Sequence, residues 1–334
     1  MHTKPNSSIR RGCAALAAVL LIAIAMPAQQ PDATAPAGKL PIWAYPVPFP
    51  AGRPAKGDNR VEHVPGSTAS YTKSQIADLF AVPDWFPNAH PPMPEVVSHG
   101  HKPAVYACGY CHLPNGQGRP ENASVAGLPT AYIVQQVADF KNGLRKSSEP
   151  GMLSVTNMVL LSKSVTDEEV KAAADYFSSI KPKPWIRVIE VENVPKTRIA
   201  GGMLVLADGG GTEPIGERVI EVPENLERTE LRDPTSGFIA YVPKGSLEKG
   251  KLLVTTGGNG TTMQCTMCHG ENLQGMGNVP SIAGRSPSQM TRQIIDFQTG
   301  ARNGSLAPLM KGVVTKLTIE DIVAITGYLA SQKP

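Results

Sequence analysis

Two pentapeptides with the pattern Cys-x-x-Cys-His are the residues of this chain whose types and spacing point to the most specific chemistry. The first holds Cys108, Cys111 and His112, and the second holds Cys265, Cys268 and His269. Two residues between the cysteines let both sulfurs form thioethers with the vinyl groups of one haem, and the adjacent histidine then reaches the iron as the proximal ligand. The pattern therefore predicts two covalently bound haem c groups.

Two other uses of such cysteines explain the pattern less well. A zinc site pairs two Cys-x-x-Cys units about 15–20 residues apart, whereas these two begin 157 residues apart. A redox-active dithiol explains neither the histidine nor the duplication. The chain has 5 cysteines, and the fifth is Cys13 near the N-terminus, so the motifs use all the others and leave none for a structural disulfide.

The duplication extends well beyond the two motifs. An offset of 157 residues superposes Gly127 on Gly284, Gln136 on Gln293, Phe140 on Phe297, Gly143 on Gly300 and Arg145 on Arg302. Further along, the offset becomes 152, and Thr166 falls on Thr318 and Glu169 on Asp321. The chain therefore contains the same helical unit twice, with five extra residues in one loop of the first copy.

The second offset also selects two methionines as distal iron ligands. Met158 superposes on Met310, and each lies seven residues before the apolar residue that precedes the cap of the last helix. Met152 is the alternative in the first copy, because its spacing of 40 residues from His112 is close to the 41 residues that separate His269 from Met310. We expect Met158 and Met310 to be the ligands and the other methionines to fill the core.

Four histidines that precede the first motif are further alternatives at the first haem. They are His63, His90, His99 and His101. We expect them to be surface or loop residues. A histidine in place of methionine would lower the reduction potential of the first haem.

The N-terminus has the features of an export signal. Lys4, Arg10 and Arg11 precede thirteen apolar residues, Ala14–Met26, which as a helix span about 20 Å and fall short of the roughly 30 Å hydrocarbon core. We predict a cleaved signal peptide over residues 1–28 and a periplasmic location, with an uncleaved anchor as the alternative. Cleavage would change the formal charge from +4 to near neutral, so no field for nucleic acid is expected.

Composition and hydrophobic periodicity divide the rest of the chain into segments. Residues 29–95 are rich in proline but carry seven of the eighteen aromatics, so we expect an ordered strap that packs on the first haem domain. Helical periodicity marks haem domains at 96–182 and 250–334, including helices near 130–143 and 166–180. Short β-branched runs mark a β-rich linking module at 183–249. The predicted strands are Ile186–Val191, Met203–Leu206, Arg218–Val222 and Phe238–Val242.

The order of these features resembles class I cytochromes c, and most closely the two-domain dihaem members. Each copy has the haem motif, a Gln-x-x-x-Phe helix, Gly-x-Arg, a methionine and an acidic-capped final helix. The resemblance implies a mainly α fold: two cytochrome c-like helical haem domains, joined here by the β-rich module and preceded by the Pro-rich strap. It also implies that a main-chain carbonyl accepts the proximal histidine's N–H; Pro280 matches that position in the second copy, and Ala123 or the nearby Pro120 in the first.

An iron with both axial positions filled exchanges single electrons and does not readily bind oxygen or peroxide. We therefore predict an electron-transfer protein without catalytic residues or a small-molecule substrate. It would pass electrons between redox proteins, free or as the cytochrome subunit of a respiratory or dehydrogenase complex, including a membrane-associated one. The alternatives are an enzyme of the dihaem peroxidase type, which needs a displaceable ligand, and a structural role in assembly of a larger complex.

Overall fold

The protein is described by a computed structural model, which defines residues 40–47 and 59–334. The predicted signal peptide, residues 1–28, lies outside this range. Within the described residues, no helix has both the length and the apolar character needed to span a bilayer.

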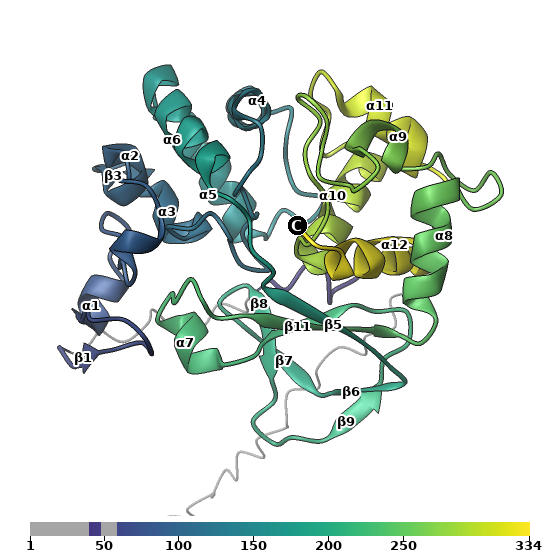
Figure 1. The fold of residues 1–334 in the computed structure, drawn as a ribbon, viewed down its shortest axis with the longest axis horizontal. Helices are drawn as coiled ribbons and strands as arrows, with labels where there is room; N and C mark the ends of the chain where they lie inside the picture. Colours follow the sequence, from purple (N-terminus) through teal and green to yellow (C-terminus); the bar gives the residue numbers. More distant parts are fainter. Residues whose placement is uncertain (1–39, 48–58) are drawn as a thin grey trace, which may run out of the picture. The chain divides into compact units, whose positions relative to one another are not determined.

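The first helical region contains the first motif and three longer helices, α4, α5 and α6 (Figure 1). Its elements are α2 (Glu95–Ser98), β3 (Gly100–His101), β4 (Val105–Tyr106), α3 (Cys108–His112), α4 (Thr130–Lys141), α5 (Leu153–Ser162) and α6 (Asp167–Ser179). The predicted capping box at α6 is confirmed: Thr166 accepts from the backbone N–H of Glu169, whose side chain accepts from the Thr166 N–H. Helix α4 packs against both α5 and α6, and apolar residues of these three helices share one cluster with residues of α2 and β4 and with Cys108 of the motif.

The segment before the first motif packs on two different parts of the molecule. Residues 59–94 form β1 (Val61–Glu62), β2 (Tyr71–Thr72), α1 (Lys73–Ile76) and η1 (Pro87–Ala89). Trp85 is 1% exposed, and its indole N–H donates to the Leu231 carbonyl at 2.8 Å, so this part is anchored to the β-rich module.

Residues 40–47 contact the first haem domain, as predicted, because Val47 lies against Gly151 and Met152 shares the cluster of Tyr45, but most of their partners belong to the second copy and the module. Trp43, Ala44 and Tyr45 join an apolar cluster made mostly of residues from the module and the C-terminal helices. The Tyr45 hydroxyl donates to Asp296 at 3.2 Å, and Arg292 donates to the Ala44 carbonyl at 2.8 Å. The physical reason is that these two buried charged groups of the second copy require polar partners, which the segment supplies.

The module between the two helical regions is a small mixed sheet with two hairpin-like pairs. Its strands are β5 (Ile186–Val191), β6 (Asn193–Pro195), β7 (Thr197–Ala200), β8 (Met203–Leu206), β9 (Thr212–Pro214), β10 (Ile220–Pro223) and β11 (Phe238–Pro243), with α7 (Leu226–Glu230) between the last two. The central sheet has the order β10-β11-β5, in which β11 is antiparallel to β10 and parallel to β5. The four predicted strands are present, whereas β6, β7, β9 and the parallel pairing were not anticipated.

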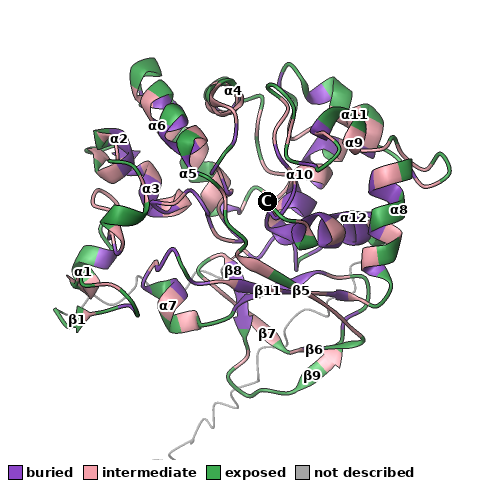
Figure 2. Cartoon of the chain, in the orientation of Figure 1, coloured by how far each residue is buried: buried purple, intermediate pink, exposed green. Residues whose placement is uncertain are grey.

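The second helical region contains α8 (Ser246–Thr256), α9 (Thr266–His269), α10 (Pro287–Thr299), α11 (Ala307–Val314) and α12 (Ile319–Ser331). Helix α12 packs against α8, α10 and the strands β5 and β11, so it lies on the sheet of the module (Figure 1). Figure 2 shows α10 and α12 as the most buried helices. The second copy, the module and residues 43–45 therefore share one continuous apolar core.

The two copies also contact each other directly, through residues that are equivalent in the repeat. Arg145 donates to Gln136 at 2.9 Å and across to Gln293 at 2.7 Å. Arg302 donates to Gln293 at 3.2 Å and across to Gln136 at 2.7 Å. The backbone repeats the same exchange, since Lys146 N–H donates to the Ala301 carbonyl and Asn303 N–H to the Leu144 carbonyl, at 2.8 and 2.7 Å. The contact therefore has local pseudo-twofold symmetry.

Candidate haem sites

The first motif forms the short helix α3, and the chain reverses direction immediately after it. Leu113 has φ 63°, a left-handed conformation that costs a leucine about 1–3 kcal/mol. The turn carries the loop back under the histidine, where Nδ1–H of His112 donates to the Ala123 carbonyl at 2.8 Å. This hydrogen bond fixes the tautomer and leaves Nε2 as the ring nitrogen with a free lone pair. Burial also lowers the pKa of His112, which favours the neutral, ligating form.

The second motif repeats this geometry with different side chains. Gly270, the equivalent of Leu113, has φ 82° and makes the same reversal without a side-chain penalty. Nδ1–H of His269 donates to the Pro280 carbonyl at 2.8 Å, and burial lowers the pKa of His269. The carbonyl expected from the resemblance is thus present in both copies, and in the first it belongs to Ala123 rather than Pro120.

The four cysteines of the motifs are unpaired thiols. Burial raises the pKa of Cys108 to about 12, with Cys111 adding to the effect, and burial raises the pKa of Cys265 to about 11. Across residues 40–47 and 59–334, no group of three or more His, Cys, Asp or Glu side chains is arranged to hold a metal ion. A zinc site built on these cysteines therefore finds no further ligands in the described part of the chain.

The predicted distal ligands lie on equivalent helices of the two copies. Met158 is on α5 and Met310 is on α11, and both side chains are partly exposed. Met152 precedes α5 and is 2% exposed in the apolar cluster that holds Tyr45 and the second copy's core. The structure therefore brings Met152 into the core, whereas Met158 and Met310 stay accessible at matching positions.

The four histidines before the first motif have other partners or lie at the surface. His90 uses both ring nitrogens, since Nε2 contacts Asp84 at 3.1 Å and Nδ1 contacts the Pro91 carbonyl at 2.9 Å. His99 and His101 are exposed and lie near Glu95 and Glu169, and His63 is also exposed. These positions agree with surface or loop roles.

The residues present fit a covalently attached haem in each copy. The donor set of two thiols and one neutral imidazole occurs twice, with the imidazole oriented by a carbonyl each time. Large apolar side chains are exposed on or next to the helices that carry the predicted methionines: Leu153 and Leu160 on α5 are 60% and 59% exposed, and Leu306 and Leu309 at α11 are 60% and 72% exposed. Such exposed apolar surface suits a large, flat apolar ring, which would cover it.

Taken together, the two sites define a protein that holds two haems covalently and positions a histidine beneath each. No protein-family model matches the chain. It is 34% identical over 70 residues to cytochrome c-554(548) of Halomonas halodenitrificans, covering 21% of this chain and 84% of that protein. It is 25% identical over 232 residues to cytochrome c4 of Azotobacter vinelandii, covering 66% of this chain and 82% of that one.

A third relative is the thiosulfate dehydrogenase electron acceptor of Thiomonas intermedia, which is 26% identical over 235 residues, covering 69% of this chain and 80% of that protein. The chain belongs to the c-type cytochromes. It is a dihaem electron carrier with two covalently bound haem c groups. The relatives named here are electron-transfer proteins, and the peroxidase alternative finds no support among them.

Two arginines that sequence reasoning did not single out contact the first site. Arg232, from the module, donates to the Tyr110 carbonyl within the motif at 2.7 Å. Arg285, from the second copy, donates to the Ser124 and Ala126 carbonyls at 2.9 and 3.1 Å, next to the Ala123 carbonyl that orients His112. The repeat offered a hint for Arg285, because its equivalent in the first copy is Leu128. No local pattern marks Arg232.

Proposed function

We propose that this chain is an exported dihaem carrier that accepts electrons from a dehydrogenase of reduced sulfur compounds and delivers them to a second redox protein. The observation that carries the proposal is the double histidine–carbonyl arrangement, which prepares two irons for single-electron exchange. When bound, each haem supplies an iron that gains or loses one electron. The choice of donor is supported by the relative named as an electron acceptor of thiosulfate dehydrogenase.

The proposal includes Met158 and Met310 as sixth ligands. Their equivalent helical positions and the burial of Met152 in the core support this assignment. With methionine opposite histidine, each iron has a raised reduction potential and no open position. Met310→Ala should therefore lower one potential and let that iron bind carbon monoxide, while both haems stay attached through their thioethers.

The methionine assignment has a matched control and a clear contradiction. Met290 lies on α10 and is 7% exposed in the apolar core, so Met290→Leu should leave both reduction potentials unchanged. Met158→Ala should affect the other haem in the same way as Met310→Ala affects its own. If Met152→Leu removed methionine ligation at the first haem and Met158→Ala did not, Met152 would be the ligand.

We propose further that protein partners approach the second motif. In the first copy, Tyr110 within the motif is 8% exposed, with the Arg232 guanidinium of the module stacked on its ring, and the preceding Gly109 lies against Val82 and Val97. In the second copy, the equivalent Met267 is 57% exposed and Cys268 is also exposed, with Met263 and Met276 exposed nearby in sequence. The expectation that the other methionines fill the core is therefore wrong for these three. The second attachment site is therefore the more accessible one for electron exchange with another protein.

The docking proposal is tested with a charge placed at the accessible motif. Met267→Lys should slow reduction of the holoprotein by thiosulfate dehydrogenase supplied with thiosulfate, whereas reduction by dithionite should not be slowed. Any rise that the added cation causes in the second haem's potential favours reduction, so a slower reaction with the dehydrogenase reports weaker docking. Leu206→Lys, on a module residue that is 52% exposed, is the matched control and should not slow either reaction. Equal slowing by both variants would argue against docking at the second motif.

We propose in addition that the chain consists of two haem domains joined by a β-rich module. We also propose that the signal at residues 1–28 exports the protein to the periplasm. The motif chemistry supports export, because c-type haem attachment and the basic and apolar N-terminal pattern point to the same compartment. N-terminal sequencing of the protein from a periplasmic extract should begin near residue 26 or 29. An intact N-terminus recovered only with membranes would favour the anchor.

A further inference from the structure

The module places a positive charge on the attachment loop of the first haem only. The Arg232 guanidinium lies 3.4 Å from the centroid of the Tyr110 ring, and it donates to the Tyr110 carbonyl at 2.7 Å. Tyr110 is the residue between Gly109 and Cys111 of the motif. The cation therefore contacts the loop whose sulfurs attach the haem.

The arginine is held in this position by its own backbone. Arg232 has φ 58°, a left-handed conformation that a non-glycine residue adopts only when its surroundings demand it. Its neighbours fix it from both sides: the Leu231 carbonyl accepts from Trp85, and Asp233 accepts from Arg228 at 2.7 Å. The side chain is therefore a placed group rather than a mobile surface arginine.

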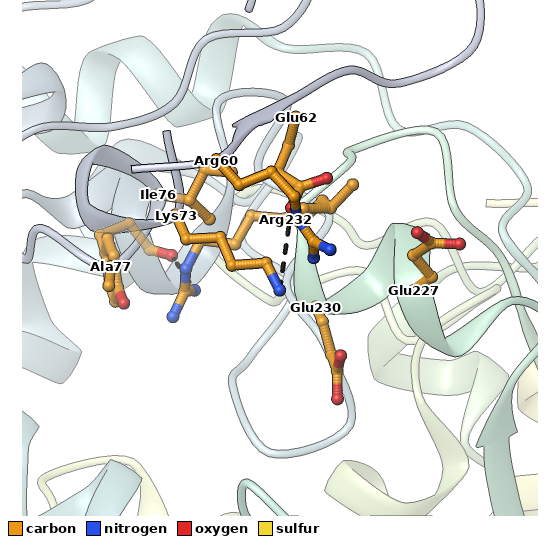
Figure 3. A pocket seen from close by; sticks show the side chains of 10 residues that line it. Arg60, Glu62, Lys73, Ile76, Ala77, Glu227, Glu230 and Arg232 are labelled. Atoms are coloured by element: carbon orange, nitrogen blue, oxygen red, sulfur yellow. Dashed lines mark hydrogen bonds and ion pairs between the residues drawn. The ribbon is translucent and has the colours of Figure 1, made fainter. Parts of the chain in front are cut away.

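The charge of Arg232 is not neutralised by an ion pair within the described part of the chain. Figure 3 shows it in the wall of a cavity of about 260 Å³ whose lining also includes Glu227 and Glu230. Neither carboxylate forms a salt bridge with Arg232, whereas the other arginine near Cys111, Arg119, is paired with Glu121. A guanidinium stays protonated throughout the pH range in which proteins are folded.

Among the residues that the structure describes, no arginine or lysine stacks on or donates to the second motif in the way that Arg232 does at the first. The equivalent of Tyr110 in the second copy is Met267, an exposed residue that lacks a ring for a guanidinium to stack on. The asymmetry comes from the module, which contacts the first motif through Arg232 and packs on the second copy through α10 and α12 instead.

We propose that Arg232 is a potential-setting residue that raises the reduction potential of the first haem above the value its ligands alone would give. A fixed positive charge beside a redox centre favours the reduced form, because the oxidised form carries one more positive charge. Partial burial strengthens this interaction, since it is screened less than a pair in bulk water. Arg232 thereby biases electrons that enter at the accessible second haem towards the first.

Arg232→Met tests this directly, because methionine keeps much of the stacked apolar volume and removes the charge. In a spectroelectrochemical titration of the holoprotein, one of the two potentials should fall and the other should stay at its wild-type value. Arg232→Lys keeps the charge but loses the planar stacking, so it should restore most of the wild-type potential. Arg198→Met is the matched control, because Arg198 is an exposed module arginine paired with Asp208, and both potentials should remain unchanged.

Several outcomes would overturn the proposal. Unchanged potentials in Arg232→Met would do so, as would equal shifts at both haems. A fall in Arg232→Lys as large as in Arg232→Met would assign the effect to packing instead of charge. The inference rests on the electron-carrier role and on haem at the first motif, so haem content is measured in the wild type and in every variant. A wild-type protein with fewer than two haems refutes the carrier proposal, whereas variants with a full complement and an unmoved potential refute only the role of Arg232.

Discussion

Replacing Arg285 with methionine should uncouple the second copy from the loop that orients the first proximal histidine. Arg285 is 7% exposed and makes four hydrogen bonds. It donates to the Ser281 carbonyl at 2.8 Å, to the Ser124 carbonyl and hydroxyl at 2.9 and 3.1 Å, and to the Ala126 carbonyl at 3.1 Å. Three of these bonds cross between the copies.

The magnitude follows from what the methionine leaves behind. It fills a similar volume, so the cavity contribution is small, but three buried carbonyl oxygens lose a charged donor. A buried polar group that loses its partner costs about 1–3 kcal/mol. Removing a buried cation recovers some of its desolvation cost, which also lowers the pKa of Arg285 to about 10 in the native protein. We expect a net loss of about 3 kcal/mol in the free energy of unfolding.

Urea unfolding of the holoprotein, followed by the fluorescence of its 3 tryptophans, measures this loss. Arg285→Lys keeps the charge but not the forked donor geometry, so it should be intermediate. Arg198→Met is the control, because its ion pair with Asp208 is exposed on both sides and contributes about 0–1 kcal/mol. A loss below about 1 kcal/mol in Arg285→Met would refute the reasoning, because bonds of this number and burial cannot be that weak.

Three further predictions concern attachment, the module and pH. Acid–acetone extraction should leave both haems on the protein, and release of one equivalent would mean that one motif is not used. A protease nick near Gly209–Gly211 should leave the fragments associated, because the module shares its core with the second copy; free haem domains would contradict that packing. The ion pair of Lys249 with Asp321, at 2.8 Å, joins α8 to α12. Burial alone would raise the pKa of Asp321, but its bonds to Lys249 and Thr318 lower it. Burial alone would lower the pKa of Lys249, but its carboxylate partners Asp321 and Glu320 raise it. The ion pair should therefore stabilise the fold between pH 3.8 and pH 10.5, the ordinary pKa values of Asp and Lys, and this stabilisation should be lost below the first value and above the second. The difference in the free energy of unfolding between wild type and Lys249→Met should accordingly shrink at both extremes of pH.

The sequence alone was sufficient to predict those features that depend on residues close together in the chain. The motif spacing predicted the two haems, because thioether attachment and histidine ligation are local constraints. The repeat predicted that Gln136 and Gln293, and likewise Arg145 and Arg302, are equivalent positions of the two copies. The capping residues predicted the start of α6, since an N-cap acts within one turn of its helix.

The tertiary structure alone decided which distant groups meet. The equivalent glutamines and arginines join the two copies, which the repeat did not reveal. Residues 40–47 lie on the second copy because Arg292 and Asp296 are buried there. Strand β5 pairs in parallel with β11, although some fifty residues separate them. Such contacts depend on how buried polar groups and unpaired strand edges find partners across the fold, and no local periodicity records that choice.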